Sequence, residues 1–322
     1  MKLATQPDGT DDGRLIVVSR DLTRAVLATA IAPSLLVAVQ RWDAVAPALQ
    51  ILSDALHAGR VASFAFEPIS PPLPRAPQWL DASAFLQHGR LMQQAFNTPE
   101  PPDFTDVPMM YQGASDDFLG PLQDVPLPDA TQGMDFEGEF GVIVGDVPMG
   151  VSAGDAGAHI RLLVTINDWS LRALGPREMK TGFGFLQAKP STSFSPVAIT
   201  PDELSAGWDG ARVHLPLRVD LNGAWFGAAS GSEMQFSFGQ LIAHAARTRR
   251  LRAGTIIGSG TVSNASADAG SSCLAERRVI EIIAQGSPST PFLAYGDRVR
   301  IWAEMPDGSA PFGHLDQRVV PG

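Results

Sequence analysis

The amino-acid sequence predicts a mainly β protein of the α+β class, and three observations lead to this prediction. The 322 residues include 31 glycines and 26 prolines, which favours short strands joined by turns over a bundle of helices. From residue 78 onward, apolar residues alternate with polar ones or form short continuous runs, as strands require. Before that point, the segment 68–77 contains five prolines. We therefore expect a small N-terminal α+β domain over residues 1–75 and a larger domain over residues 76–322.

Composition and charge narrow the class of protein. Hydrophobic residues make up 44% of the chain and charged residues 18%, a globular balance. A net charge of -10, without a basic stripe that includes aromatic residues, argues against nucleic acid as a partner. The single cysteine, Cys273, excludes an internal disulfide and a cysteine-based zinc site. Because the first residues lack the apolar run of a signal peptide and no stretch is long enough to span a bilayer, we expect a cytoplasmic protein without membrane contact.

The N-terminal domain is expected to combine short strands with a helix. The strands are predicted at residues 3–5, 15–18 and 25–28. Ser34 is a typical N-cap for the helical pattern that follows. We expect Pro47 to restart or kink this helix and Gly59 to end it.

The larger domain is expected to contain several strands and two short helices. Residues 160–166 form a nearly continuous apolar run, which is typical of a strand buried on both faces. The dipeptide Asn222-Gly223 predicts a hairpin between a strand at 213–222 and its return at 224–226. Further strands are expected at 134–145, 279–283 and 298–303, and helices after a capping box that starts at Thr200 and at 238–248.

The predicted strand at residues 134–145 is the most informative segment for function. Alternate side chains of a strand share a face, so Asp135, Glu137 and Glu139 are expected to project together. Neighbouring carboxylates cannot easily stay ionised without a cation between them, and Gly138 leaves room for a close approach. These carboxylates therefore suggest a metal site, and the alternative is the solvated face of an amphipathic strand.

Two further carboxylates and a histidine are candidates for the same site. Asp168 follows the predicted strand 160–166, where a buried charge is costly unless it is paired or ligates a metal; alternatively, it caps a turn. Asp81 is either a metal ligand or the N-cap of a helix. His88 is a candidate catalytic base, although a single histidine is more often structural.

In their order along the chain, these segments resemble the catalytic motifs of the fumarylacetoacetate hydrolase family. The family has an Asp followed by a His seven residues later, which matches Asp81 and His88. Its paired-glutamate strand, and its Asn-Asp-Trp-Ser motif with a nearby Arg, are similar to residues 135–139 and 167–172. Its later Lys before a Ser-Pro dipeptide, its Ser-Gly-Thr loop and its Tyr-x-Gly segment have counterparts at Lys189, 259–261 and 111–113. The resemblance runs from residue 78 to residue 312.

This resemblance implies a mixed β-roll for the larger domain, a homodimer and a set of site residues. The implied metal ligands are Asp81, Glu137, Glu139 and Asp168. The implied catalytic residues are His88, its acidic partner Glu276, Arg172 and Lys189, and the implied substrate-binding residues are Tyr111, Ser83 and Thr261. At Ala173 and Gly175, where eukaryotic fumarylacetoacetases carry Asp and Gln, the sequence departs from the family, so the substrate stays open. Candidates for an apolar pocket, or for the core, are Phe183, Phe185, Phe194 and Trp169.

The residue types also indicate a chemistry. Four carboxylates without cysteine or histidine form an oxygen-only site, which selects Mg²⁺ first and Ca²⁺ or Mn²⁺ as alternatives. We expect a hydrolase that cleaves the carbon–carbon bond of a small 1,3-diketo acid, such as fumarylacetoacetate or an acylpyruvate, by His88-activated water with a metal-stabilised enolate leaving group. Two alternatives stay open: an isomerase, decarboxylase or hydratase acting on 2-oxo acids with the same metal site, and a non-catalytic, metal-stabilised binding protein. His88 favours the hydrolase, because stabilising an enolate does not require a base for water.

Overall fold

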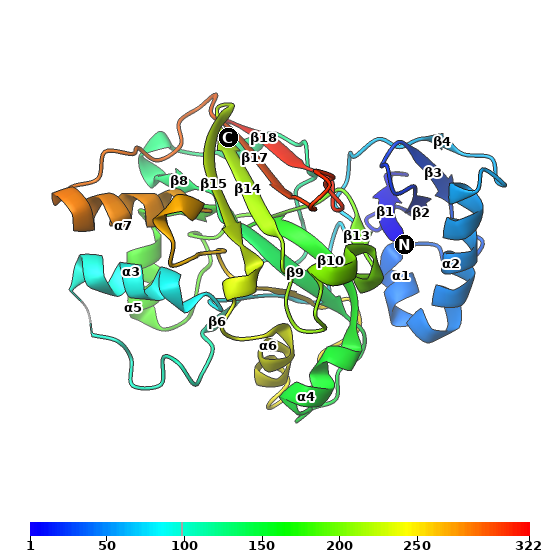
Figure 1. Cartoon of the computed structure of the whole chain (residues 1–322), viewed down its shortest axis with the longest axis horizontal. Coiled ribbons are helices and arrows are strands. Elements are labelled where there is room, and N and C mark those ends of the chain that lie inside the picture. The colour runs from blue at the N-terminus through cyan, green and yellow to red at the C-terminus, as the bar shows by residue number, and fades with distance from the viewer. Residues whose placement is uncertain (98) are drawn as a thin grey trace.

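A computed structural model describes residues 1–97 and 99–322 (Figure 1). Within these residues the strands form an eleven-stranded sheet, a five-stranded sheet and a two-stranded ribbon. The largest sheet has the strand order β4-β3-β2-β1-β13-β10-β9-β16-β5-β6, with β12 beside β10. The protein is therefore of the α+β class with strands dominant, as the sequence predicted.

The N-terminal part, blue in Figure 1, is a small sheet with two helices packed on it. Its elements are β1 (Lys2–Gln6), β2 (Arg14–Val18), β3 (Arg24–Leu27), β4 (Phe64–Ala65), α1 (Leu35–Gln40) and α2 (Trp42–His57). The predicted strands and N-cap are confirmed, and Ser34 Oγ accepts a hydrogen bond from the Val37 N–H. The helix is interrupted at Arg41, whose N–H donates to carbonyl groups in the last turn of α1, and it restarts at Trp42. Pro47 therefore lies inside α2 and does not start it.

Strand β1 joins this part to the rest of the chain. It pairs with β2 on one side and with β13 (Ala198–Ile199) on the other, so the small sheet continues into the large one. Leu3 and its partner Ala198 are both fully buried at this seam. The division of the chain at residue 75 therefore stays a prediction, because hydrogen-bonded strands run across it.

The centre of the large sheet is strand β9 (Gly138–Val144), which lies between two antiparallel neighbours. These are β10 (Ile160–Asn167) and β16 (Ile256–Gly258). Beyond β16 come β5 (Trp79–Ala82) and β6 (Met110–Gly113), and β12 (Ser193–Phe194) pairs with the end of β10. Every residue from 134 to 144 is buried. The alternative of a solvated acidic face is therefore wrong, because the acidic side chains of this segment point into the protein.

The segment predicted as one strand at 134–145 is divided into two. Its first part, β8 (Met134–Asp135), pairs with β11 (Ser170–Leu171) in the two-stranded ribbon. Glu137 lies between β8 and β9, and its N–H donates to Asn167 Oδ1 over 3.0 Å. The interruption brings the ends of β9 and β10 together at the place where the candidate ligands lie.

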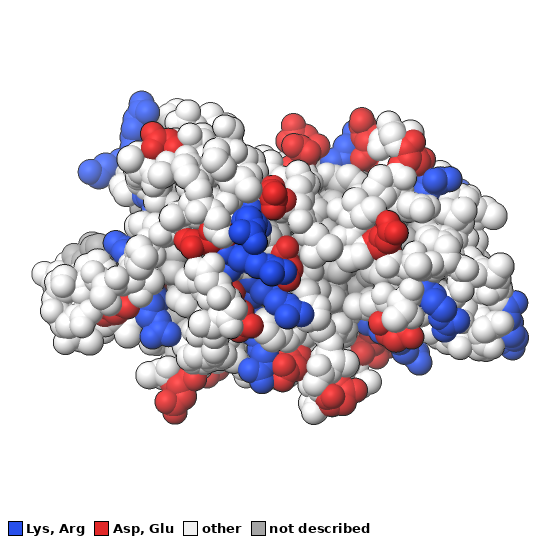
Figure 2. Space-filling model, turned by 90° about the horizontal axis from the view of Figure 1, so that it is seen from above, with Lys and Arg blue, Asp and Glu red and all other residues white. Residues whose placement is uncertain are grey.

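The five-stranded sheet lies across the top of the molecule in Figure 1. Its strands, in order, are β15 (Ala224–Ser230), β14 (Pro216–Leu221), β17 (Arg298–Ala303), β18 (Leu315–Pro321) and β7 (Val125–Leu127). The predicted hairpin is confirmed, since Asn222 and Gly223 adopt the positive φ angles, 54° and 80°, that a tight two-residue turn requires. Seen from above in Figure 2, charged side chains of both signs are interspersed, and in this sheet Arg298 pairs with Asp316.

Three helices gather at the end of the molecule opposite the N-terminal part (Figure 1). They are α3 (Leu86–Phe96), α5 (Gly175–Thr181) and α7 (Leu274–Gln285). The strand predicted at 279–283 is wrong, because this segment lies inside α7. Its β-branched residues favour a strand, but Cys273 Sγ caps the helix by accepting the Glu276 N–H, and the Asp135 carboxylate accepts the first two helical N–H groups. A sequence pattern does not reveal these contacts.

The remaining helices are short. They are α4 (Ala153–Ala156), α6 (Phe238–Ala245) and the 3₁₀ helices Ala130–Gln132, Gly157–His159, Pro201–Gly207, Gly231–Glu233 and Ala267–Ala269. The helix expected at 238–248 is confirmed as the shorter α6, whereas the capping box at Thr200 is not formed, because Thr200 Oγ1 bonds to Met1 instead. None of the helices in the described part of the chain is long and apolar enough to cross a bilayer.

Candidate active site

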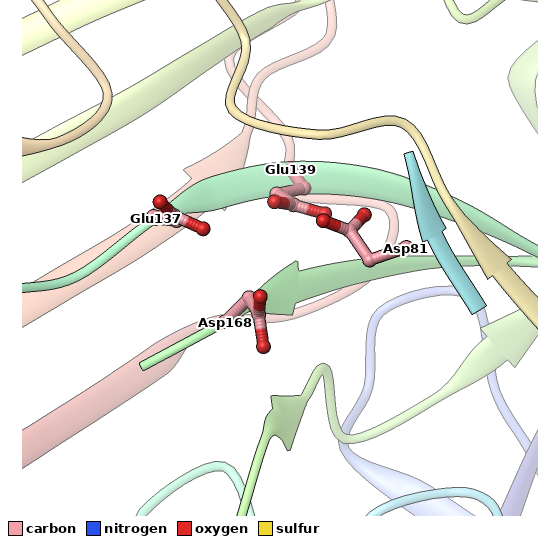
Figure 3. A group of neighbouring side chains, drawn as sticks. All are labelled: Asp81, Glu137, Glu139 and Asp168. Carbon is pink, nitrogen blue, oxygen red and sulfur yellow. The ribbon is translucent and has the colours of Figure 1, made fainter. Parts of the chain in front are cut away.

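Four buried carboxylates meet at one place beside the large sheet (Figure 3). Asp81 comes from β5, Glu139 from β9, Glu137 from just before β9, and Asp168 from just after β10. One oxygen of each lies within 4.8 Å of the others, and all four side chains are buried. The structure thus brings together the four residues predicted as metal ligands, although they are spread over 88 positions of the chain from 81 to 168. Asp81 is part of a strand, so its alternative interpretation as a helix N-cap is wrong.

Glycines allow two of these carboxylates to lie against the backbone of the neighbouring strand. A Cβ on Gly258 of β16 would lie 2.4 Å from Asp81 Oδ1 and 2.9 Å from Glu139 Oε2. The N–H of Gly260 donates to Asp81 Oδ1 over 3.1 Å. Gly260 also has a φ of +76°, and a Cβ there would lie 2.2 Å from Ala82 O. A side chain at Gly258 would displace the two carboxylates, and one at Gly260 would collide with the backbone of β5, so this segment is shaped to the cluster.

Glu139 and Asp81 form a side of the cluster without a counter-charge. Both carboxylate oxygens of Glu139 are buried, and no described residue donates a hydrogen bond to them. Burial and the neighbouring Asp81 carboxylate raise the pKa of Glu139 well above its usual range. Burial and Asp168 raise the pKa of Asp81 to about 7. Unpaired buried carboxylate oxygens are the ligands that a hard divalent cation prefers, so these residues fit such an ion.

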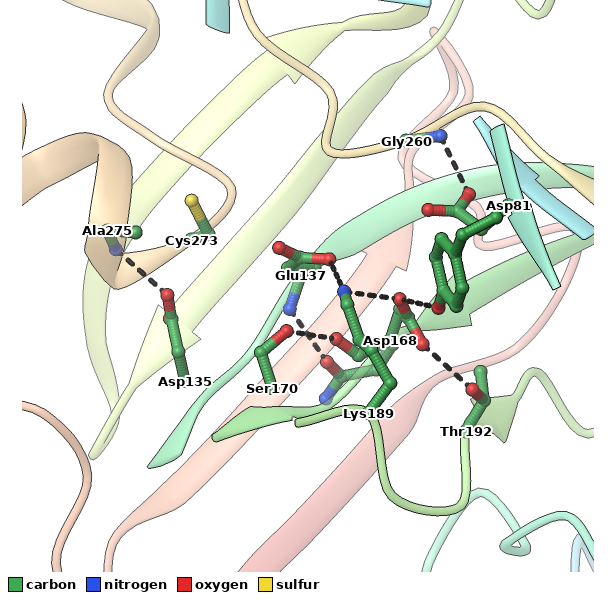
Figure 4. A network of polar contacts seen from close by, with 12 residues as sticks. Asp81, Asp135, Glu137, Asp168, Ser170, Lys189, Thr192, Gly260, Cys273 and Ala275 are labelled. Carbon is green, nitrogen blue, oxygen red and sulfur yellow. Dashed lines mark hydrogen bonds and ion pairs between the residues drawn. The ribbon is translucent and has the colours of Figure 1, made fainter. Parts of the chain in front are cut away.

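Glu137 and Asp168 form the other side of the cluster, where Lys189 lies between them (Figure 4). Lys189 Nζ lies 2.5 Å from Glu137 Oε2 and 2.5 Å from Asp168 Oδ2. Arg172 Nη2 donates to Glu137 Oε1 over 2.6 Å. Burial alone would raise the pKa of Glu137, but Lys189 and Arg172 outweigh it and lower that pKa to about 2. Lys189 and Arg172 are therefore ion-pair partners of the cluster, with side chains that are 9% and 25% exposed.

Asp168 is also held by two hydroxyl groups. Tyr111 of β6 donates to its Oδ2 over 2.6 Å, and Thr192 donates to its Oδ1 over 2.8 Å. Burial and the Asp168 carboxylate raise the pKa of Tyr111 well above its usual range, which keeps its proton in this bond. Thr192 was missed in the sequence, because an isolated Thr before the strand β12 has no pattern that distinguishes it.

His88 and Glu276 form a second pair of site residues. His88 lies in the first turn of α3 and Glu276 in the first turn of α7, and His88 Nδ1 lies 2.8 Å from Glu276 Oε2. The Glu276 side chain is 2% exposed and that of His88 is 18% exposed. The structure thus brings the two side chains into contact, even though 188 positions separate them, and their catalytic roles stay predictions.

Asp135 lies between this pair and the carboxylate cluster in the network of contacts, and Figure 4 shows its bond to Ala275. The expectation that its carboxylate projects with those of the two glutamates into a metal site is wrong. Its oxygens accept hydrogen bonds from the N–H groups of Leu274 and Ala275, over 2.7 and 2.9 Å, at the N-terminus of α7. Arg172 Nε donates to the same carboxylate over 2.8 Å. A negative charge is favoured at a helix N-terminus, so Asp135 fixes the helix that carries Glu276.

A cavity of about 660 Å³ opens beside the site. His88, Ser170, Arg172 and Lys189 form a polar part of its wall, and Ala173 and Gly175 also line it. Phe185 is the single residue of the four aromatic candidates that lines this cavity, since Phe194 and Trp169 are core residues and Phe183 is 97% exposed. Its lining does not include the predicted substrate-binding residues Ser83, Tyr111 and Thr261, whose roles stay predictions.

Comparisons with known proteins agree on one family. The model "Fumarylacetoacetate (FAA) hydrolase C-terminal" matches residues 78–320, and "Fumarylacetoacetase N-terminal domain 2" matches residues 1–75. The chain is 29% identical to a 2,4-didehydro-3-deoxy-L-rhamnonate hydrolase of a Sphingomonas species, over 48% of this chain and 52% of that protein. It is 25% identical to an oxaloacetate tautomerase of Bacillus subtilis, over 73% of this chain and 66% of that protein. The matches thus span between one half and two thirds of these curated relatives.

A solved structure with the same fold is that of a maleylpyruvate hydrolase from a Sphingobium species, in complex with a manganese(II) ion and pyruvate. The superposition has a TM-score of 0.68 at 18% sequence identity and covers 100% of both chains. This likeness extends over the N-terminal part as well as the part that carries the site, so the whole fold is shared.

We expect the carboxylate cluster to make the stability of the protein depend on divalent metal. Adding Mn²⁺ or Mg²⁺ to chelator-treated protein should raise the melting temperature, since an ion at 100 times its dissociation constant stabilises the native state by about 2.7 kcal/mol. Replacing Glu139→Gln should abolish most of this increase in thermal-shift measurements. The control is Glu304→Gln, which removes the carboxylate partner of Arg218 in the five-stranded sheet. This variant should keep the full metal-dependent increase in melting temperature. Melting that is independent of metal would contradict the assignment of the cluster.

Without metal, the two glutamates should differ in the sign of their effect. The raised pKa of Glu139 means that its charged form is unfavourable in the fold, so Glu139→Gln should stabilise the metal-free protein at pH 7 to 8. The pKa of Glu137, lowered to about 2, means that its charge is favoured, so Glu137→Gln should destabilise it at the same pH. Denaturant unfolding in the presence of chelator measures the free energy of unfolding of both variants. Equal effects of the same sign would contradict the difference between the paired Glu137 and the unpaired Glu139.

Asp135→Asn should destabilise the protein far more than a matched change at the surface. Removing one partner of a buried, hydrogen-bonded ion pair costs about 3–5 kcal/mol; here Arg172 would keep only Glu137 as a counter-charge, and the first N–H groups of α7 would lose a charged acceptor. Asp12 forms a similar two-bond pair with Arg75 in solvent, and Asp12→Asn should cost less than about 1 kcal/mol. The free energies of unfolding from denaturant titration give the comparison, and equal costs would show that Asp135 does not anchor α7.

Proposed function

The chain belongs to the fumarylacetoacetate hydrolase family, and from that membership we propose that it is a metal-dependent hydrolase of a small 1,3-diketo acid. The bond it would cleave is the carbon–carbon bond between the acyl group and the 2-oxo acid of an acylpyruvate or fumarylacetoacetate type of substrate. The observation that carries the proposal is the His88–Glu276 pair, 2.8 Å apart, in the wall of a cavity that also contains Lys189 and Arg172. Hydrolysis needs a base for water, and this pair supplies one.

The histidine is held in the orientation that a base requires. Nδ1 of His88 is occupied by Glu276, so Nε2 remains to accept a proton in the cavity. Glu276 fixes this tautomer and would stabilise the imidazolium that forms when His88 takes a proton. Because Glu276 lies in the first turn of α7, the Asp135 contacts at that turn help to position it.

The proposed reaction uses one water molecule and needs no oxidant or reductant. His88 takes a proton from water, and the water oxygen forms a bond with the acyl carbonyl carbon. The carbon–carbon bond to the 2-oxo acid then breaks, and its electron pair remains on the departing enolate. Return of the proton to the enolate carbon gives a carboxylic acid and a 2-oxo acid. Lys189 and Arg172 lie where they can offset negative charge on the substrate.

A divalent cation held by Asp81, Glu137, Glu139 and Asp168 would stabilise negative charge that develops on the oxygens of the departing 2-oxo acid. We propose Mg²⁺ as this ion, with Mn²⁺ and Ca²⁺ as alternatives, since oxygen-only sites accept all three. The related maleylpyruvate hydrolase, which binds manganese and pyruvate, supports a divalent metal and a 2-oxo acid ligand.

A second candidate function is tautomerisation of a 2-oxo acid such as oxaloacetate. Similarity to an oxaloacetate tautomerase over 73% of this chain favours it. Such a reaction moves a proton between carbon and oxygen and leaves the carbon skeleton intact, so it does not require water activation. The non-catalytic alternative is disfavoured because mere metal binding would not need the His88–Glu276 pair at the cavity wall.

The division into residues 1–75 and 76–322 is part of this proposal, and the boundaries of the two matching family models support it. A homodimer and a cytoplasmic location stay predictions. Similarity to known members of the family suggests the dimer, while the sequence composition suggests the compartment.

The proposed activity should appear as loss of the ultraviolet band of an enolised diketo acid. Purified protein with Mg²⁺ or Mn²⁺ should consume fumarylpyruvate, fumarylacetoacetate or a simple acylpyruvate and release two acids, and a chelator should stop the reaction. Oxaloacetate is tested in parallel for loss of its enol band without cleavage. If oxaloacetate alone responds, the tautomerase is the function, and the hydrolase proposal fails.

Replacing the proposed base should reduce hydrolysis by roughly 10²- to 10⁴-fold in kcat. His88→Ala and Glu276→Gln are both expected to lose activity, with the larger loss for His88. A matched control is His214→Ala, which removes an exposed histidine that pairs with Asp209 at 2.7 Å and should leave kcat unchanged. Full hydrolytic activity of His88→Ala would exclude His88 as the base for water.

A further inference from the structure

The cavity contains one cation that the proposed mechanism does not use. Arg278 lies on α7, and Ala275, Arg278, Val279 and Ile282 all line the cavity. Their spacing places them on one face of the helix, so a stripe of α7 forms this wall. Met92, Met179, Phe185 and Phe292 also line the cavity and are apolar. Arg278 is therefore a charged residue in a largely apolar part of the wall.

The three cations of the cavity differ in their partners. Lys189 and Arg172 are each bound to two buried carboxylates. Among the described residues, no carboxylate lies within 4.0 Å of the Arg278 guanidinium. Glu281, one turn further along α7, is occupied by Ser289 and Thr290 of the following loop. The positive charge of Arg278 is thus uncompensated, whereas the charges of the other two are balanced.

Two contacts hold the Arg278 side chain in place. Its Nη1 donates to the backbone oxygen of Thr290, and its Cζ lies 4.1 Å from the centre of the Phe292 ring. Stacking on an aromatic ring restricts the planar guanidinium, and its other N–H groups can still donate. Less conformational entropy is then lost when an anion binds.

The size of the cavity favours a ligand with more than three carbon atoms. Its volume of about 660 Å³ lies in the range of sites for ligands much larger than a three-carbon acid. Lys189 and Arg172 mark the end that would receive the 2-oxo acid. Apart from the three cations, His88, Thr131 and Ser170, the wall consists of apolar residues, and Ala173 and Gly175 add no polar groups.

We infer that Arg278 determines substrate specificity by binding a carboxylate at the far end of the acyl chain. The preferred substrates are then 2-oxo acids with a second, distal carboxylate, joined through a short apolar or unsaturated chain. This inference rests on the proposed function, because it assigns the 2-oxo acid to the Lys189 end of the cavity. Arg278 contacts the substrate at a distance from the reacting bond and takes no part in water activation.

The test compares two ligands that are not cleaved, with purified protein loaded with Mn²⁺. 2-Oxoadipate and 2-oxohexanoate have the same six-carbon chain and differ in a terminal carboxylate against a methyl group. Isothermal titration calorimetry should give a dissociation constant about tenfold or more lower for 2-oxoadipate, as expected for a charge-assisted hydrogen bond. Arg278→Gln should remove this preference while the affinity for 2-oxohexanoate changes less than about twofold.

Two further variants separate the subsite from general effects. Arg277→Gln removes the same charge from the next position of α7, where Arg277 contacts Phe226 and does not line the cavity, so the preference should persist. Arg278→Lys keeps the charge and should retain part of the preference if Arg278→Gln is poorly folded. Absence of a preference in the unmodified protein, or an undiminished preference in Arg278→Gln, would overturn the inference.

This experiment can fail independently of the proposed function. Binding is measured without turnover, so a preference that depends on Arg278 supports the subsite even if no diketo acid is cleaved. Conversely, hydrolysis of acylpyruvates that have no distal carboxylate, together with equal binding of the two 2-oxo acids, would support the hydrolase and reject the subsite.

Discussion

The structure of the site depends on the mutual repulsion of four buried carboxylates. Two unit charges 4 Å apart repel by about 4 kcal/mol at an effective dielectric constant of about 20, and here four carboxylates have oxygens within 4.8 Å of one another. Lys189 and Arg172 offset this repulsion at Glu137 and Asp168. Glu139 has no such partner among the described residues. The fold therefore stabilises one half of the cluster and leaves the other half suited to an added cation.

The same network connects the cluster to the base. Arg172 binds both Glu137 and Asp135, and Asp135 in turn accepts the first N–H groups of α7. Glu276 follows in the same turn and holds His88. A helix N-terminus, a buried carboxylate and a guanidinium thus form a chain of contacts in which each member compensates the charge of the next. This chain fixes the distance between the base and the cluster without a direct contact between them.

Much of the fold was predictable because its strands have simple local patterns. The continuous apolar run of β10 and the Asn222-Gly223 turn each determine their structure within a few residues. The predicted strand at 279–283 failed because contacts distant in sequence decide the conformation there: Asp135, nearly 140 positions earlier, caps α7. For the site, ordered motifs identified the four carboxylates and His88, whereas Thr192 and the true position of Asp135 depend on contacts that a sequence pattern does not contain.

The charges left unbalanced by the protein indicate what it binds. In the cluster beside the cavity the carboxylates of Asp81 and Glu139 have no cationic partner among the described residues, and in the cavity wall the guanidinium of Arg278 has no carboxylate partner among them. Burying uncompensated carboxylates is unfavourable, a cost that a bound cation removes, while the half-buried Arg278 guanidinium can gain an anionic partner. A divalent metal meets the first requirement. A 2-oxo acid with a distal carboxylate meets the second, and its oxo-acid group brings it to Lys189 and Arg172. The electrostatic asymmetry of the site is therefore complementary to a metal and an elongated dianionic substrate acting together.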